Sequence, residues 1–390
     1  MNTTLHEFTN EDYTKTRNLD ANAELDPDLL HEYLSSIEKI NDLKKLKDKI
    51  TELKNSLNNF VLDGEPNGIK VSKSTFTKEL EQLEETLSLQ RLSHYINIIK
   101  KGFEKQKNGK INDINFNRWK EYENIMTDSL WYWPKRDNSG VHMSSYHGNF
   151  IPQIPNQAML RYTKQGDTVL DVFLGSGTTL IECKRLGRNG IGVELQPNVA
   201  IEAEKLINKQ ISDYDIKTKV LTGDSRKKET NEKIKLVMQD YGIDKVQLLI
   251  MHPPYADIIK FSNMEEDLSN TNSLKEFLDE FGKVIDNTYD LLEDNRYLVI
   301  VIGDKYQGKE WIPLGHLTMM EAIKRGFLLK SVIVKNMEGN RAKRNQEKLW
   351  RLRALKGGFY IFKHEYVFIL QKTNKSRIID ELKDFNRFNH

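Results

Sequence analysis

The chain has 390 residues, of which 38% are hydrophobic and 30% are charged. This length suits one large domain or two ordinary ones, and the absence of a run of about 18 apolar residues argues against a membrane span. The net charge of +2 excludes a uniformly basic nucleic-acid coat, so any charge that binds DNA must be local.

The first residues lack the basic and then apolar pattern of a signal peptide. Cys183 is the one cysteine, which excludes an internal disulfide and a cysteine-based zinc site, and no metal is expected. This composition fits a reducing cytoplasm. Cys183 falls within a predicted helix, where we expect a packed thiol, not a nucleophile.

Helical spacing begins after a polar, irregular stretch, residues 1–25, which we expect to be a mobile arm. Within the predicted helical region 26–130, apolar residues step by alternating threes and fours. They are Leu43, Leu46, Ile50, Leu53, Leu57 and Phe60. Gly64, Pro66 and Gly68 interrupt this seam, and the spacing resumes from Phe76 to about residue 105. The pattern predicts an antiparallel helical hairpin.

Three roles for the hairpin stay open at this point. It packs on the rest of the chain, or it forms a homodimer through the seam, or it contacts DNA or a restriction or defence partner. The charges that flank the seam are mixed in sign, so they do not favour DNA over a protein partner.

From residue 148 onward, short apolar runs alternate with amphipathic stretches. Strands are predicted at 168–171, 190–194, 219–222, 246–251 and 296–302, with helices at 178–188, 197–209 and 273–293. Two further strands, 328–334 and 366–370, are expected to close the sheet as a pair. This alternation predicts an α/β fold with a mostly parallel sheet covered on both faces. We assign residues 131–373 to a catalytic domain and residues 374–390 to a C-terminal tail.

A glycine loop follows the first of these strands, with the sequence Asp-Val-Phe-Leu-Gly-Ser-Gly-Thr-Thr at residues 171–179. Ligands of open parallel sheets bind at the carboxyl ends of the strands. Gly175 and Gly177 allow a tight turn and a close approach of the backbone to a ligand. The candidate ligand-binding residues of this loop are Asp171, Phe173, Gly175, Gly177 and Thr178.

Acidic residues end the next two strands. Glu194 is placed to accept hydrogen bonds from both hydroxyls of a ribose, and Asp224 from an adenine amino group. The glycine loop lacks the third glycine that a dinucleotide pyrophosphate requires, whereas a nucleoside with an amino-acid tail does not require it. The alternative is a strand–turn–helix joint whose glycines serve geometry alone.

A second short motif, His252-Pro253-Pro254-Tyr255, follows the predicted strand 246–251. Together, the glycine loop and this motif, in this order, resemble the signature of the S-adenosylmethionine (SAM)-dependent amino methyltransferases. That family methylates adenine N6 or cytosine N4 in DNA. The resemblance covers about residues 145–372 and does not extend to residues 1–130.

The resemblance implies a Rossmann-like sheet of seven strands with a hairpin at one edge, and SAM as the cofactor. It also implies that the segment before the first strand folds over the methionine end of the cofactor. In this chain Phe150 and Pro152 occupy that segment. The implied substrate is double-stranded DNA from which the target base is flipped.

The roles of the second motif also follow from the resemblance. The side chain of His252 and the carbonyl of Pro253 would accept hydrogen bonds from the exocyclic amino group, which frees its lone pair. Pro254 restricts the conformation of Pro253, and Tyr255 offers a ring on which the base stacks. Asp257, Lys260 and Ser262 follow, and they either line the pocket or are solvated.

The histidine departs from the family's common pattern, which has Asp, Asn or Ser at this position. His252 accepts a hydrogen bond only when it is neutral. We therefore expect the rate to fall as pH drops through a pKa of about 6.5. The usual hint that separates cytosine N4 from adenine N6 is lost, and we favour adenine slightly on frequency alone. The alternative is a structural histidine.

The segment 335–363 is rich in lysine and arginine, with aromatic residues interleaved. Cations of this kind bind phosphates, and arginine also reads guanine edges. The candidate DNA-contacting residues are Lys335, Arg341, Lys343, Arg344, Arg351 and Arg353. The alternative is a solvated basic helix anchored by an aromatic residue.

These features together favour a site-specific DNA amino methyltransferase. An RNA amino or guanine methyltransferase is the nearest rival, because a similar Pro-Pro-Tyr loop occurs there. A non-catalytic nucleic-acid-binding subunit that keeps the fold is another, as is a helical adaptor whose methyltransferase part serves assembly.

Overall fold

A computed structural model describes residues 23–63, 68–142, 148–337 and 347–373. The chain divides into two compact units, Met1–Asn124 and Ile125–His390, which are described separately. Most of the expected arm and the whole of the expected tail lie outside the described residues. The division falls close to the boundary at 130 that the sequence pattern suggests.

The first unit is helical, but it is not a two-helix hairpin. It contains α2 (Pro27–Ile37), α3 (Leu43–Asn55), α4 (Lys73–Glu84) and α5 (Leu89–Glu104), with the 3₁₀ turns η1 (Leu57–Phe60) and η2 (Phe116–Tyr122). The additional helix starts arise at N-caps that the apolar spacing does not report. The side chains of Asp42, Ser72 and Ser88 each accept a hydrogen bond from a backbone N–H in the first turn of α3, α4 and α5.

The predicted seam lies inside this unit's own core. Leu46, Ile50 and Leu53 of α3 are fully buried among apolar side chains of α2, α4 and α5, such as Leu34 and Phe76. Because these side chains already pack within the unit, the seam does not offer an open apolar face for a second copy of the chain.

The second unit is built on an eight-stranded sheet with the order β1-β9-β10-β6-β5-β2-β3-β4. The strands are β1 (Leu130–Trp131), β2 (Thr168–Asp171), β3 (Asn189–Glu194), β4 (Thr218–Thr222), β5 (Val246–Met251), β6 (Leu292–Ile302), β9 (Phe327–Asn336) and β10 (His364–Lys372). β4, β3, β2, β5 and β6 run parallel, and β10 runs antiparallel to both β6 and β9. The expected seven-stranded α/β sheet is therefore confirmed, with β1 added outside β9.

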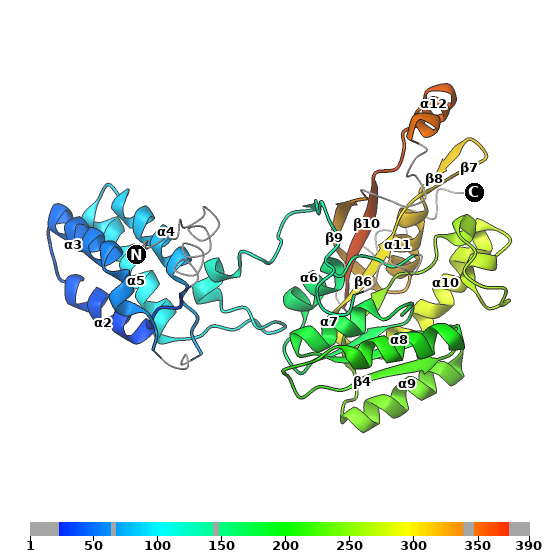
Figure 1. The fold of residues 1–390 in the computed structure, drawn as a ribbon, viewed down its shortest axis with the longest axis horizontal. Helices are drawn as coiled ribbons and strands as arrows, with labels where there is room; N and C mark the ends of the chain where they lie inside the picture. The colour runs from blue at the N-terminus through cyan, green and yellow to red at the C-terminus, as the bar shows by residue number, and fades with distance from the viewer. Residues whose placement is uncertain (1–22, 64–67, 143–147, 338–346, 374–390) are drawn as a thin grey trace, which may run out of the picture. The chain divides into compact units, whose positions relative to one another are not determined.

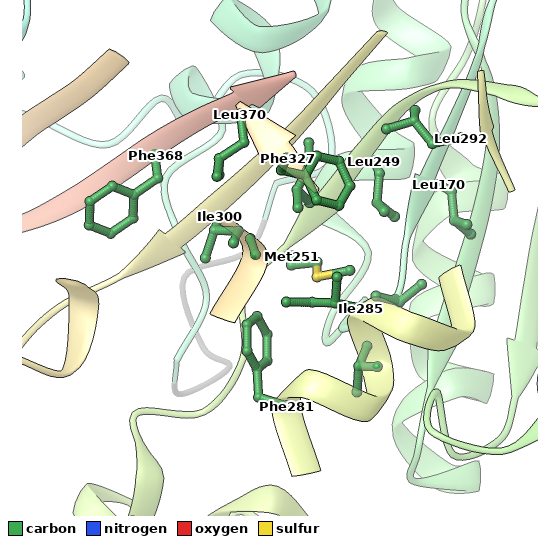
Figure 2. Close-up of a cluster of buried hydrophobic side chains, with 14 of the residues drawn as sticks. Leu170, Leu249, Met251, Phe281, Ile285, Leu292, Ile300, Phe327, Phe368 and Leu370 are labelled. Carbon is green, nitrogen blue, oxygen red and sulfur yellow. The ribbon is translucent and has the colours of Figure 1, made fainter. Parts of the chain in front are cut away.

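The central strands bury side chains on both faces. One face carries Leu249 and Met251 of β5 against Phe281 and Ile285 of α10 (Leu274–Tyr289), as Figure 2 shows. The other face carries residues such as Ile250. Strands that are apolar on both faces are typical of a sheet covered by helices on both sides.

The two faces are covered by different helices (Figure 1). The face in Figure 2 packs on α9 (Lys228–Tyr241), α10 and α11 (Leu314–Lys324). The opposite side contributes α6 (Gln153–Tyr162), α7 (Thr178–Leu186) and α8 (Pro197–Lys209). Cys183 of α7 is fully buried, and burial raises its pKa well above the usual value, which fits the expected packed thiol.

Several elements were not predicted, among them β1, α6, α9, α11 and a hairpin of β7 (Lys305–Gln307) and β8 (Glu310–Ile312). The helix α12 (Glu347–Gly357) agrees with the alternative given for the segment 335–363, a basic helix. The hairpin and α12 each follow a strand end of the sheet, and each supplies residues to the site described below. Among the residues that the structure describes, no helix is long and apolar enough to cross a membrane.

Candidate active site

A cavity of about 1190 Å³ lies at the carboxyl ends of the parallel strands. It is lined by the glycine loop after β2, the ends of β3 and β4, the motif after β5, β7, and residues of β9, α12 and β10. The sheet therefore brings together the two motifs that the sequence separates. The predicted residues that line the cavity are Phe150, Phe173, Gly175, Glu194, Asp224, Lys335, Arg353 and all four residues from His252 to Tyr255.

The glycine loop has the left-handed turns that its glycines permit. Gly175 has φ of 53° and Gly177 has φ of 89°. A Cβ on Gly177 would lie 2.8 Å from Cδ1 of Ile207 on α8, so a side chain there meets both backbone strain and a packed neighbour. These glycines are required by the fold of the loop itself, before any ligand is considered.

Asp171 and Thr178 do not line the cavity, and their side chains form hydrogen bonds within the protein. The carboxylate of Asp171 is buried and accepts hydrogen bonds from Oγ1 of Thr179 at 2.5 Å and from the N–H of Phe173 at 3.0 Å. Burial raises its pKa to about 6. The hydroxyl of Thr178 donates to Asn149 at 2.8 Å.

Glu194 reaches the cavity from the end of β3. Its two oxygens accept from the N–H groups of Gly175 and Gln196, each at 2.9 Å. Burial outweighs these hydrogen bonds and raises the pKa of Glu194 to about 7. Each carboxylate oxygen keeps a second acceptor position, so the site fits a ligand with paired hydroxyls.

Asp224, at the end of β4, is engaged within the protein. Its oxygens accept from Nε and Nη2 of Arg226 at 2.8–3.1 Å, and Arg226 also pairs with Glu280 of α10. An adenine amino group would therefore meet an ion pair here and not the isolated carboxylate that we expected.

The segment before α6 joins the two motifs. The side chain of Asn149 donates to Ser176 of the glycine loop at 2.6 Å. The next residue, Phe150, is buried, and its ring lies 4.9 Å from the ring of His252, edge to face. Phe150 lines the cavity, whereas Pro152 does not, and a role for either residue at the methionine end of the cofactor stays a prediction.

His252 lies at the centre of the cavity wall, directly after β5. Among the described residues neither of its ring nitrogens has a hydrogen-bond partner, and the carbonyl of Pro253 likewise accepts no hydrogen bond. Burial, with a smaller contribution from the charge of Lys335, lowers the pKa of His252 to about 4, and Glu365 opposes the shift. Because the imidazole is partly removed from water, the loss of rate that the sequence predicts near pH 6.5 is now expected at lower pH.

Tyr255 is held in place by residues far away in the sequence. Its hydroxyl donates to Oε2 of Glu365 on β10 at 2.7 Å. A Cβ on Gly303, just after β6, would lie 2.9 Å from Cε2 of the ring, so the ring packs directly on the glycine backbone. Burial and the neighbouring carboxylate raise the pKa of Tyr255 well above the usual value.

Lys335 is the clearest difference from the predicted DNA-contacting set. Its side chain is 8% exposed and donates to Oε1 of Glu365 at 2.9 Å, so it belongs to the cavity wall and not to an open basic surface. No pattern in the sequence points to Glu365 as a residue of the site. Its position opposite Lys335 depends on the register between β9 and β10, which residue counts do not reveal.

The remaining basic candidates divide between α12 and the segment before it. Arg351 and Arg353 lie on α12 and are exposed, and the guanidinium of Arg353 lies 5.2 Å from the ring centre of Trp350. Arg341, Lys343 and Arg344 lie outside the described residues.

The outer wall of the cavity is aromatic. The rings of Tyr306 and Phe359 stack with centres 4.2 Å apart, and the Trp311 and Phe362 rings lie 4.1 Å apart. Asp257 also lines the cavity and pairs with Lys305 of β7. Lys260 and Ser262 do not line it, and Ser262 instead donates to Asp267 at 2.8 Å.

Comparison with known proteins agrees with this geometry. A family model described as DNA methylase matches residues 17–205 and 246–389. The Type II methyltransferase M.MjaII of Methanocaldococcus jannaschii is 40% identical over 77 residues, which is 20% of this chain and 13% of that protein. The Type II methyltransferase M.BglI of Bacillus subtilis is 31% identical over 114 residues, 29% of this chain and 30% of that protein.

A methyltransferase that acts on RNA is also similar. The tRNA (guanine(10)-N2)-dimethyltransferase of M. jannaschii is 25% identical over 169 residues, 43% of this chain and 42% of that protein. The chain thus spans less than half the length of each of these relatives. Among solved structures, a SAM-dependent methyltransferase from Methanosarcina mazei is 14% identical with a TM-score of 0.35, covering 58% of this chain and 100% of that one.

Proposed function

The chain belongs to the adenine-N6 and cytosine-N4 DNA methylase family, and on that premise we propose that it transfers a methyl group from SAM to an exocyclic amino group of a base in DNA. One observation carries the proposal. An uncharged His252 and an open Pro253 carbonyl face the same cavity as the glycine loop and Glu194.

The cavity residues fit SAM, the cofactor of this family. The turn at Gly175 brings backbone close to the cavity, Glu194 would accept from the ribose hydroxyls, and Phe150 and Phe173 offer apolar surface. When bound, SAM supplies a methyl group attached to a positively charged sulfur. The residues of the chain then have to place an amino nitrogen in line with that methyl carbon and keep water away.

The amino group of a base is a weak nucleophile because its lone pair is delocalised into the ring. His252 and the carbonyl of Pro253 would each accept one N–H, which pulls the nitrogen toward tetrahedral geometry. The freed lone pair would then be available to the methyl carbon that SAM supplies, with the S–C bond breaking as the N–C bond forms. The nitrogen would release one proton, which an uncharged ring nitrogen of His252 would accept.

The base must leave the duplex to reach this depth, and Tyr255 provides the ring against which it stacks. Arg353 of α12 lines the cavity, and with the exposed Arg351 of the same helix it would bind phosphates of the duplex. None of the described residues that line the cavity distinguishes adenine from cytosine, and adenine N6 is the first product to look for.

RNA methylation is the second candidate, and the similarity to the tRNA guanine methyltransferase favours keeping it. In that case the same two acceptors would serve an amino group of an unpaired base. The helical unit, Met1–Asn124, would then be the part of the chain to test for RNA binding.

The test is methylation-sensitive long-read sequencing of DNA from a methylation-free host that expresses the chain. We expect one modified base within one sequence motif, and a much smaller modified fraction with a His252→Ala variant. Unmodified DNA from cells whose purified protein is folded and binds SAM would overturn the proposal. Methylation of cellular RNA by the same protein would then support the second candidate.

A further inference from the structure

A buried ion pair lies beneath the catalytic loop. Lys335 of β9 and Glu365 of β10 are directly opposite each other in the antiparallel ladder, and their side chains are 8% and 9% exposed. Both line the cavity that holds His252 and Tyr255. Both also act electrostatically on the His252 ring, Lys335 disfavouring its protonated form and Glu365 favouring it.

This part of the sheet does not require an ion pair for its packing. Two residues further into the sheet on the same face, Ile333 and Val367 are buried in an apolar cluster. Taking two charges out of water is expensive, and a pair of apolar residues is often at least as stable in such a place. Packing therefore does not explain why the ion pair lies beside His252 and Tyr255, which suggests a role in the reaction.

Glu365 has one of two roles in the pair, which is to hold the Tyr255 ring in position. The hydroxyl of Tyr255 donates to one carboxylate oxygen at 2.7 Å, while Lys335 donates to the other at 2.9 Å. The ring also rests on the backbone of Gly303. A base that stacks on Tyr255 therefore meets a ring whose direction is set before binding.

The second role belongs to Lys335, which offers hydrogen-bond donors to the cavity. Its ammonium carries three N–H donors, and among the described residues Glu365 is its one hydrogen-bond partner. The other two donors lie at the wall of the cavity without a protein acceptor. A buried donor without a partner is costly, so this arrangement favours a ligand that brings an acceptor.

Adenine and cytosine each bring such an acceptor. In both bases a ring nitrogen with a lone pair, N1 in adenine and N3 in cytosine, lies next to the carbon that bears the amino group. A base whose amino group is held by His252 and Pro253 presents this nitrogen at the side of its ring.

We propose that Lys335 and Glu365 form a base-binding pair, in which Glu365 positions Tyr255 and Lys335 donates a hydrogen bond to the ring nitrogen next to the target amino group. The pair then recognises the class of aminated base, while the sequence around the base is read elsewhere. This inference rests on the proposed function, since it assigns recognition residues to the same site.

The test for Lys335 uses DNA in which the target base lacks that ring nitrogen, 1-deazaadenine or 3-deazacytosine as the sequenced product directs. We expect wild-type protein to methylate the analogue roughly 10- to 100-fold more slowly than the natural base, as for a lost hydrogen bond to a charged group. Lys335→Met should slow the natural base by a similar factor. It should then show little further loss with the analogue.

A change in the intrinsic reactivity of the analogue affects both proteins equally. The ratio of the fold-loss of wild type to the fold-loss of Lys335→Met therefore reports the contact between Lys335 and the ring nitrogen alone. If Lys335→Met loses as much with the analogue as wild type does, the contact is absent and the inference is overturned. Because Lys335→Met leaves Glu365 buried without a counterion, the double variant Lys335→Met/Glu365→Gln gives the same comparison in a neutral background.

The test for Glu365 compares Glu365→Leu with Tyr255→Phe, both in the Lys335→Met background so that the loss of Glu365 leaves no buried ammonium unpaired. We expect each to lower kcat further without changing the Kd for SAM, and the variant that carries both to be no slower than the slower of the two, because both remove the same hydrogen bond. Fully multiplicative losses would overturn the positioning role. Fluorescence of 2-aminopurine at the target position gives an independent readout of base stacking in these variants.

Failure of the inference and failure of the proposed function are distinguishable. If wild-type protein methylates the natural base but the two proteins lose equally with the analogue, this inference alone falls. If wild-type protein binds SAM and methylates no DNA, both fall together.

Discussion

The two loops that follow β2 and β5 differ in whether their polar groups form hydrogen bonds within the protein. At the first loop, Asp171, Thr178 and the adjoining Glu194 at the end of β3 all have hydrogen-bond partners within the protein. After β5, the ring nitrogens of His252 and the carbonyl of Pro253 have none among the described residues. The first loop is shaped by its internal hydrogen bonds, whereas the second keeps its acceptors available. Substitutions should therefore reduce stability or cofactor binding in the first loop and the reaction rate in the second.

The largest effect on the reaction rate is expected from His252→Ala, in the second loop. We expect kcat to fall by about 100- to 1,000-fold, as for the loss of one preorganised hydrogen-bonding group in an active site. Melting temperature and SAM affinity should stay close to wild type, because His252 makes no hydrogen bond that the fold requires. A variant that loses SAM binding or melts several degrees lower would place His252 among the structural residues.

The pH dependence of kcat tests whether His252 acts as a hydrogen-bond acceptor in the reaction. Only uncharged His252 accepts a hydrogen bond, and its pKa is lowered to about 4. At saturating SAM, kcat should therefore stay level from pH 8 to about 5 and fall as pH drops through 4. His252→Asn, if it retains activity, should lack this acid limb. A wild-type limb centred near 6.5 would contradict the lowered pKa.

Glu194→Gln tests the first loop through cofactor affinity. The pKa of Glu194 is raised to about 7 by burial. If ribose hydroxyls donate to the carboxylate, binding requires the ionised form, and the Kd for SAM should rise by up to tenfold per pH unit below 7. The glutamine variant should bind more weakly at pH 8 and show no such dependence. Isothermal titration calorimetry from pH 6 to 8 measures both, and parallel curves would contradict the assignment.

Gly177→Ala tests whether the glycine loop is shaped by packing. Alanine there adopts a left-handed φ of 89° and also meets Ile207, so we expect unfolding free energy to fall by about 2 kcal/mol or more. Gly242→Ala is the matched control. It has φ of 74° with nothing within 4 Å of the added Cβ, and should cost about 1 kcal/mol. Equal losses in urea unfolding would show that the Ile207 contact is unimportant.

The smallest expected effect concerns the exposed surface of α12. Arg351→Ala should weaken DNA binding and reduce the slope of log affinity against log salt by about 1, as for one lost phosphate contact. Lys209→Ala, at the far end of α8, should leave the slope unchanged. An unaltered slope for Arg351→Ala would remove this position from the DNA surface.

The parallel sheet and the meeting of the two motifs were predictable from the sequence, because both depend on local patterns. Apolar runs indicate strands such as β5, and parallel strands place their carboxyl ends at one edge. His252 and Glu194 could therefore be placed in one site. The short cap residues that divide the helical unit were overlooked, since the apolar spacing that resumes at Phe76 continues across the break between α4 and α5.

What could not be predicted depends on contacts between distant segments. Lys335 has the composition of a phosphate-binding residue, and only the strand register shows that Glu365 neutralises it. Asp171 ends its strand as expected, yet its carboxylate turns to Thr179 and away from the cavity. In both cases the residue type was read correctly, but its partner was set by tertiary structure.

The position of β10 has a consequence for synthesis on the ribosome. This strand lies between β6 and β9, although both of those precede it in the chain. Translation at about 5–20 residues per second exposes β6 and β9 as open edges until residue 372 emerges. During that interval the nascent chain already displays strands able to pair with other polypeptides. Co-translational folding of this unit should therefore depend on chaperones more strongly than that of a sheet assembled in sequence order.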